Sequence, residues 1–150
     1  MVTNQIKEIE NARVLHREED LQMKLMGSLA DAVRFIANTA VEDEPDVSRV
    51  YFDTAKFRAF ANGFIGATID ALEPVELDSL VKATFSITVE LASRFLDDYL
   101  TGDLYFRCNY PKHNLVRTRC QLALAKDIER KWDELSWIVR DVTEKIRNKK

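Results

Sequence analysis

The sequence predicts an all-α fold, a helical bundle of about five helices in a single domain that covers residues 1–150. Only four glycines and three prolines interrupt the 150 residues, so few positions favour turns. Alanine, leucine, glutamate, lysine and arginine, which are good helix formers, are abundant. Apolar residues also recur at spacings of three and four, as they do on one face of a helix.

The N-terminal part of the sequence is predicted to be an irregular helical segment over residues 1–27, with a thin apolar stripe on a polar background. Ser28 then has the residue type of an N-cap for a clearer helix that ends near Asn38. The following stretch, "VEDEPDVSRV", is acidic and contains a proline, which suits an exposed loop.

Three further residues have the chemistry of helix starts. Asp53 is predicted to cap a helix with a wide apolar face, and Pro74 to be the first residue of a long central helix that continues to Leu100. Asn114 is the expected cap of one last helix, which ends in the basic "KIRNKK". The best candidate for a strand is the short "DLYFRC".

Composition argues against several classes of protein. The net charge is -3, from 22 basic and 25 acidic residues, so we expect no nucleic-acid partner and no anionic membrane partner. Two cysteines and two histidines suit neither a disulfide framework nor a zinc site. The polar start does not look like a signal peptide, and no apolar run approaches the length of a membrane span. We therefore expect a cytoplasmic location.

The stretch "RFLDDYLTGDLYFRCNYPKHNLVRTR", residues 94–119, is unusual because aromatic and charged residues outnumber turn formers there. Nucleotide-binding, nucleophile-elbow and metal-binding motifs are missing from the sequence. Asp97 and Asp98 are adjacent and so point to different sides of a helix, which does not suit an acid/base pair. His113, beside a turn, has the position of a surface or capping residue.

Three strings carry a family resemblance: "RFIANTAVEDEPDVSRVYFD", "FRAFANGFI" and "RFLDDYLTGDLYFRCNYPKHNLVRTRCQLALAKDIERKWDEL". They resemble, in order, the C-terminal helical portion of the aminoglycoside phosphotransferase-like kinases, in the branch of the N-acetylhexosamine 1-kinase type. The similarity covers about residues 28–140. It implies the fold of the C-terminal subdomain of a protein-kinase-like phosphotransferase.

The resemblance also implies a sugar site. Arg94 and Tyr105 match positions that contact the sugar, and Trp132 or Trp137 would line the same pocket. Guanidinium and hydroxyl groups hydrogen-bond sugar oxygens, and an indole face packs on the C–H surface of a sugar ring. The structural alternative is that Arg94 pairs with an aspartate of its own helix, while the aromatic residues fill gaps between helices.

The sequence departs from complete kinases of this family, which use ATP and Mg²⁺. It shows no counterpart of the nucleotide-binding small lobe or of the HGD catalytic loop. The short "DLQMKLMG" resembles the magnesium-aspartate segment, with Asp20 in the metal position, but we assign no metal ligand, no catalytic residue and no cofactor to this chain alone. Phosphoryl transfer needs those parts together.

The leading prediction is a truncated or separate C-terminal subdomain of a sugar-kinase-like phosphotransferase, without catalysis of its own and with a remnant wall of an amino-sugar site. The alternative is a helical interaction or dimerisation module, and an enzyme completed by another polypeptide is a third. We expect a homo-oligomer, or a missing kinase lobe as partner, because an isolated subdomain would leave apolar surface bare.

Overall fold

The computed structural model describes residue 24 and residues 26–149, and this part of the chain is helical with no strand. A helix over residues 26–37 comes first. It is followed by the 3₁₀ helix η1 (Val47–Arg49), α2 (Thr54–Thr68), α3 (Pro74–Asp78), α4 (Leu80–Thr101), α5 (His113–Arg130) and α6 (Trp132–Arg147). The predicted all-α fold is confirmed. The candidate strand "DLYFRC" is instead an irregular connection between α4 and α5.

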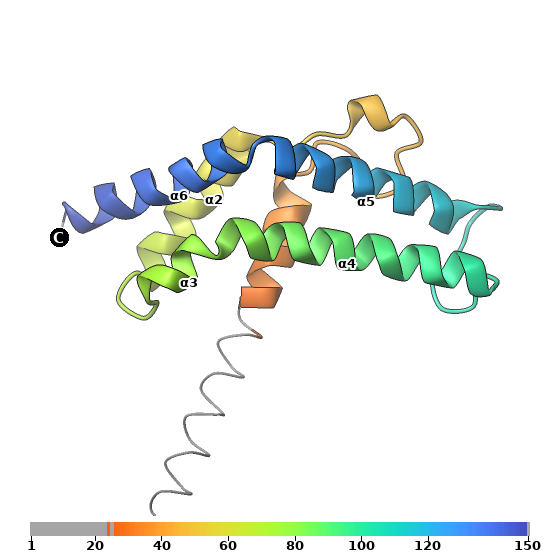
Figure 1. The fold of residues 1–150 in the computed structure, drawn as a ribbon, viewed down its shortest axis with the longest axis horizontal. Coiled ribbons are helices and arrows are strands. Elements are labelled where there is room, and N and C mark those ends of the chain that lie inside the picture. Colours follow the sequence, from red (N-terminus) through yellow and green to blue (C-terminus); the bar gives the residue numbers. More distant parts are fainter. Residues whose placement is uncertain (1–23, 25, 150) are drawn as a thin grey trace, which may run out of the picture.

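Two helix packings organise the bundle, an antiparallel packing of α4 with α5 and a parallel packing of α2 with α6 (Figure 1). Helix α5 runs back along α4, and α6 continues beyond α5 to pack on α2, while the helix over residues 26–37 crosses near the middle. The core lies between these packed helices. Its largest fully buried apolar side chains come from the helix over residues 26–37, the segment before α2 and α2 to α6: Val33, Phe52, Phe57, Ile65, Leu77, Leu80, Phe95, Leu124, Ile128 and Leu135.

The predicted last helix is divided at Lys131, where φ is -97° and ψ is 10°. The break has a tertiary cause, because Lys131 Nζ donates to Phe52 O at 2.7 Å and to Asp127 Oδ2 at 2.6 Å. Asp127 Oδ2 also accepts from Phe52 N at 2.8 Å. This junction ties the segment before α2 to the end of α5 and lets α6 turn toward α2.

Two other predicted boundaries are wrong and two are right. Ser28 lies inside a helix rather than at its N-cap, and the predicted central helix is divided at Ser79, whose Oγ donates to Glu76 O at 2.7 Å. Asp53 does cap α2, with Oδ1 accepting from the N–H groups of residues 55 and 56 at 2.9 and 3.0 Å. Pro74 does begin a helix. Asp20 and most of the predicted N-terminal segment lie outside the described residues.

Candidate functional site

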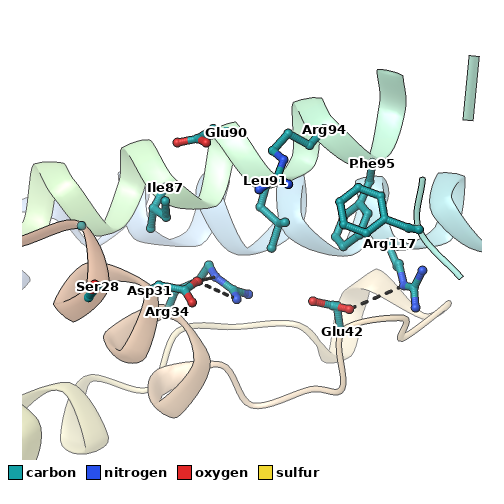
Figure 2. Close-up of a pocket in the computed structure, with 12 residues that line it drawn as sticks. Ser28, Asp31, Arg34, Glu42, Ile87, Glu90, Leu91, Arg94, Phe95 and Arg117 are labelled. Atoms are coloured by element: carbon teal, nitrogen blue, oxygen red, sulfur yellow. Dashed lines mark hydrogen bonds and ion pairs between the residues drawn. The ribbon is translucent and has the colours of Figure 1, made fainter. Parts of the chain in front are cut away.

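A pocket of about 440 Å³ lies between the helix over residues 26–37, the acidic loop at residues 41–46, α4 and the first half of α5. Figure 2 shows Ile87 and Leu91 of α4 above Asp31 and Arg34 of the facing helix. The pocket is thus lined by both apolar and charged groups. It contains three arginines and three acidic residues: Arg34, Arg94, Arg117, Asp31, Glu42 and Glu90.

Arg34 and Arg117 form what we call the inner wall of the pocket, and neighbouring groups hold both side chains. Arg34 is buried and binds Asp31 through Nε and Nη2, both at 2.9 Å from Oδ1. Its Nη1 donates to Oε1 of the fully buried Gln121 at 3.2 Å. Arg117 is fixed from α5, where its guanidinium carbon lies 5.3 Å from the centre of the Phe95 ring. Both guanidinium groups are therefore oriented before any ligand arrives.

Arg94 and Tyr105, two of the predicted site residues, come together at the outer wall of the pocket. The guanidinium carbon of Arg94 lies 5.8 Å from the centre of the Tyr105 ring and 5.5 Å from that of Phe106. Arg94 and Phe106 line the pocket. Tyr105 is 75% exposed and contacts Phe106 edge-on at a centroid distance of 4.8 Å. Arg94 therefore lines the pocket, and Tyr105 lies beside it.

Asp98 shapes the connection that carries these aromatic residues. Its buried carboxylate accepts from the backbone N–H groups of Tyr105 at 2.7 Å and Phe106 at 2.9 Å, and from Asn114 Nδ2 at 2.8 Å. Burial raises the pKa of Asp98, but these hydrogen bonds outweigh it and hold the pKa below its ordinary value of 3.8. The loop therefore engages Asp98, one of the two aspartates of α4 that the structural alternative offered to Arg94 as a partner.

Asn114 is therefore not the helix cap that the sequence suggested. Its Nδ2 donates to Asp98 and, at 2.9 Å, to Asp103 Oδ1, so the side chain serves the loop. The N-cap of α5 is Lys112, which has a left-handed φ of 67°. Asn114 is a polar residue near a helix start, but the two acceptors of its Nδ2 lie 16 and 11 residues away.

His113 is also placed differently from its prediction as a surface or capping residue, because it is 2% exposed. Asn109 N donates to His113 Nδ1 at 3.2 Å, so the proton of the neutral ring belongs on Nε2, which lies 3.0 Å from Asp43 Oδ2. Tyr110 stacks on the imidazole at 4.2 Å, and its hydroxyl donates to the same oxygen at 3.2 Å. This cluster fastens the acidic loop to the start of α5.

The two predicted tryptophans lie away from Arg94. Trp132 contacts Phe85 edge-on at a centroid distance of 5.9 Å. Phe85 precedes Arg94 by nine residues on α4, roughly 14 Å at 1.5 Å per residue. Trp137 is half exposed and lies under the guanidinium of Arg58, at 5.1 Å. The structure therefore joins Arg94 with Tyr105 and separates both from the tryptophans.

Sequence reasoning missed the inner wall. Arg34 is the first residue of the first resembling string, but its partner Gln121 is 87 residues away. Arg117 and Glu42 lay within strings that carried the resemblance, yet nothing in their local pattern distinguished them from surface charges. Their 3.5 Å approach depends on how the acidic loop folds over α5.

Other site types find little support in the described part of the chain. Residues 24 and 26–149 contain no group of three His, Cys, Asp or Glu side chains arranged to hold a metal ion. None of the described helices is both long and apolar enough to span a membrane. Burial raises the pKa of both free thiols, Cys108 and Cys120, which disfavours the reactive thiolate. No protein-family model matches the sequence.

Proposed function

We propose that the chain is a C-terminal helical subdomain of a sugar-kinase-like phosphotransferase, without catalysis of its own, and that its pocket binds a sugar against a wall formed by Arg94 and Phe106. The observation that carries this proposal is the composition of the pocket. Charged groups that donate and accept hydrogen bonds surround an apolar surface of Ile87, Leu91 and Phe95.

Such a mixture suits a sugar. Hydroxyl groups donate and accept at once, so they match arginines and carboxylates placed side by side, while the C–H face of the ring packs on apolar side chains. The volume of about 440 Å³ lies in the range of small-molecule sites. The proposal concerns sugar binding alone and includes no step of phosphoryl transfer by this chain.

The test is isothermal titration of the purified chain with N-acetylglucosamine and N-acetylgalactosamine. We expect saturable binding that Arg94→Ala weakens about tenfold, since a lost charged hydrogen bond is worth about 1.5 kcal/mol or more. Arg140→Ala, an exposed arginine of α6 away from this pocket, is the matched control. Absence of binding at millimolar sugar, or equal binding by the Arg94 variant, would contradict the assignment.

A second candidate, a helical interaction module, is favoured by a different observation. Leu96, Leu100 and Leu104 are 38%, 72% and 84% exposed at and just beyond the C-terminal end of α4. Leu96 and Leu100 lie one turn apart on α4, and exposed apolar surface is often covered by association. We call these three residues the leucine patch.

A further inference from the structure

The pocket is cationic at its inner wall and acidic at its rim. The side chains of Arg34 and Arg117 are 8% and 15% exposed, whereas those of Asp31 and Glu42, their acidic partners, are 56% and 46% exposed. Carboxylates that are half exposed are screened by water and salt, while buried guanidinium groups are screened much less. A ligand that reaches the inner wall therefore meets mainly positive charge.

Arg117 is held in a fixed orientation and, in the part of the chain that the structure describes, keeps one N–H group without an acceptor. Its Nη1 donates to Asn114 Oδ1 at 3.0 Å and to Arg107 O at 3.2 Å, and its guanidinium lies over Phe95. Its Nε is buried and finds no hydrogen-bond acceptor among the described residues. The nearest acidic oxygen, Glu42 Oε2, is 3.5 Å away, a contact that counts as an ion pair but not as a hydrogen bond.

The second buried donor without an acceptor in the described structure is Nε2 of Gln121, the residue that accepts a hydrogen bond from Arg34. Gln121 is fully buried, and its Oε1 accepts from Arg34 Nη1, which fixes the orientation of the amide. Its Nε2 then has no acceptor within the described part of the chain. Two buried N–H donors thus have no acceptor in residues 24 and 26–149, one on Arg117 of the inner wall and one on Gln121, which is hydrogen-bonded to Arg34 of that wall. Buried donors of this kind normally have an acceptor.

We propose that the inner wall of the pocket binds an anionic oxygen group, a carboxylate or a phosphate, carried by a sugar. Arg117 Nε donates to this group, and Glu42 is the weakly held residue that the ligand displaces. Arg94, the third guanidinium of the pocket, adds positive charge from α4. The inference rests on the proposed function in one respect, namely that the pocket accepts a sugar.

Matched ligands that differ in one acidic group test the proposal. Isothermal titration compares glucose with glucuronate, and N-acetylglucosamine with N-acetylglucosamine 6-phosphate. We expect the acidic member of each pair to bind at least tenfold more tightly, or at least one pair to show this preference and so to identify the anion as carboxylate or phosphate. Equal or weaker binding of both acidic members, or no binding of any of the four at millimolar concentration, would overturn the proposal.

Two variants assign the effect to named atoms. Arg117→Gln should abolish the acidic preference, with Arg119→Gln, an exposed arginine of the same helix, as control. Glu42→Gln should increase affinity for the acidic sugar threefold or more, and this gain is measurable even if Arg117→Gln fails to fold. Exposed Glu134 provides the control Glu134→Gln. An acidic preference retained in Arg117→Gln, or an affinity unchanged in Glu42→Gln, would contradict the proposal.

An inorganic phosphate titration separates this inference from the proposed function. If neutral and acidic sugars bind equally, the sugar site stands and the anion subsite fails. If phosphate alone binds with the same dependence on Arg117 while no sugar binds, the sugar function fails, and so does the claim that a sugar carries the anion. Preference for the acidic sugar over both phosphate and the neutral sugar supports the two proposals together.

Discussion

At the scale of single residues, two neighbours with the same side chain perform different tasks. Asp97 is exposed, whereas Asp98 is buried and accepts hydrogen bonds from two backbone N–H groups and one side-chain amide. The sequence indicates a charged pair on a helix, but only the folded connection brings the three donors to one carboxylate. Asp98 therefore positions Phe106 and, through it, the outer wall of the pocket.

The pH dependence of stability follows from these hydrogen bonds. The folded state lowers the pKa of Asp98, so its contribution is complete above the ordinary value of 3.8 and is lost as the pH falls through the lower folded value. Asp98→Asn should lower the Tm at pH 7 clearly more than Asp97→Asn does. The Tm difference between the parent and Asp98→Asn should shrink below about pH 4. Thermal melts from pH 7 to pH 2 that showed a constant difference would refute this role.

The candidate site shows the same limit on sequence reasoning. Arg94 and Tyr105 lie within one unusual stretch, so their proximity could be predicted. Arg34 and Arg117 come from segments far apart in the chain, and their shared pocket depends on packing of the N-terminal described helix against α4 and α5. Local sequence patterns do not predict that two residues so far apart in the chain will line one pocket.

At the scale of elements, boundaries set by local chemistry were predictable and boundaries set by packing were not. Asp53 caps α2 through its own neighbours, and Gly102 ends α4 with a left-handed φ of 101°. The breaks at Ser79 and Lys131 contain neither glycine nor proline. Lys131 instead bonds to Phe52 O, 79 residues away, so a sequence that locally favours one long helix forms two.

One substitution made at two glycines tests this local control. Gly102→Ala should destabilise the chain by about 1–2 kcal/mol, because a Cβ disfavours the left-handed backbone even though it meets no atom within 4 Å. Gly63→Ala, in the interior of α2 and also without close neighbours, should stabilise it by about 1 kcal/mol. Urea unfolding measures both changes. Effects of the same sign would show that backbone conformation is not the cause.

At the scale of the whole molecule, the apolar stripe of the last helix is covered from within the chain. Leu135, Ile138, Val139 and Val142 are buried, and α6 packs on α2. We expect association because an isolated subdomain would leave apolar surface bare, but this stripe of α6 is buried. The leucine patch remains as exposed apolar surface at the other end of the molecule, near the turn between α4 and α5 (Figure 1).

If the chain associates, the leucine patch is therefore the surface we expect to mediate it. Light scattering should show a dimer as the chain concentration rises from about 10 µM to about 1 mM. Leu100→Lys should weaken the dimer by at least about tenfold, because withdrawing a buried leucine from an interface costs about 1.5–3 kcal/mol. Leu122→Lys changes a leucine of α5 that is 49% exposed outside the patch and should leave the dimer intact. A parent chain that stays monomeric throughout, or a dimer equally sensitive to both substitutions, would rule out this patch as the interface.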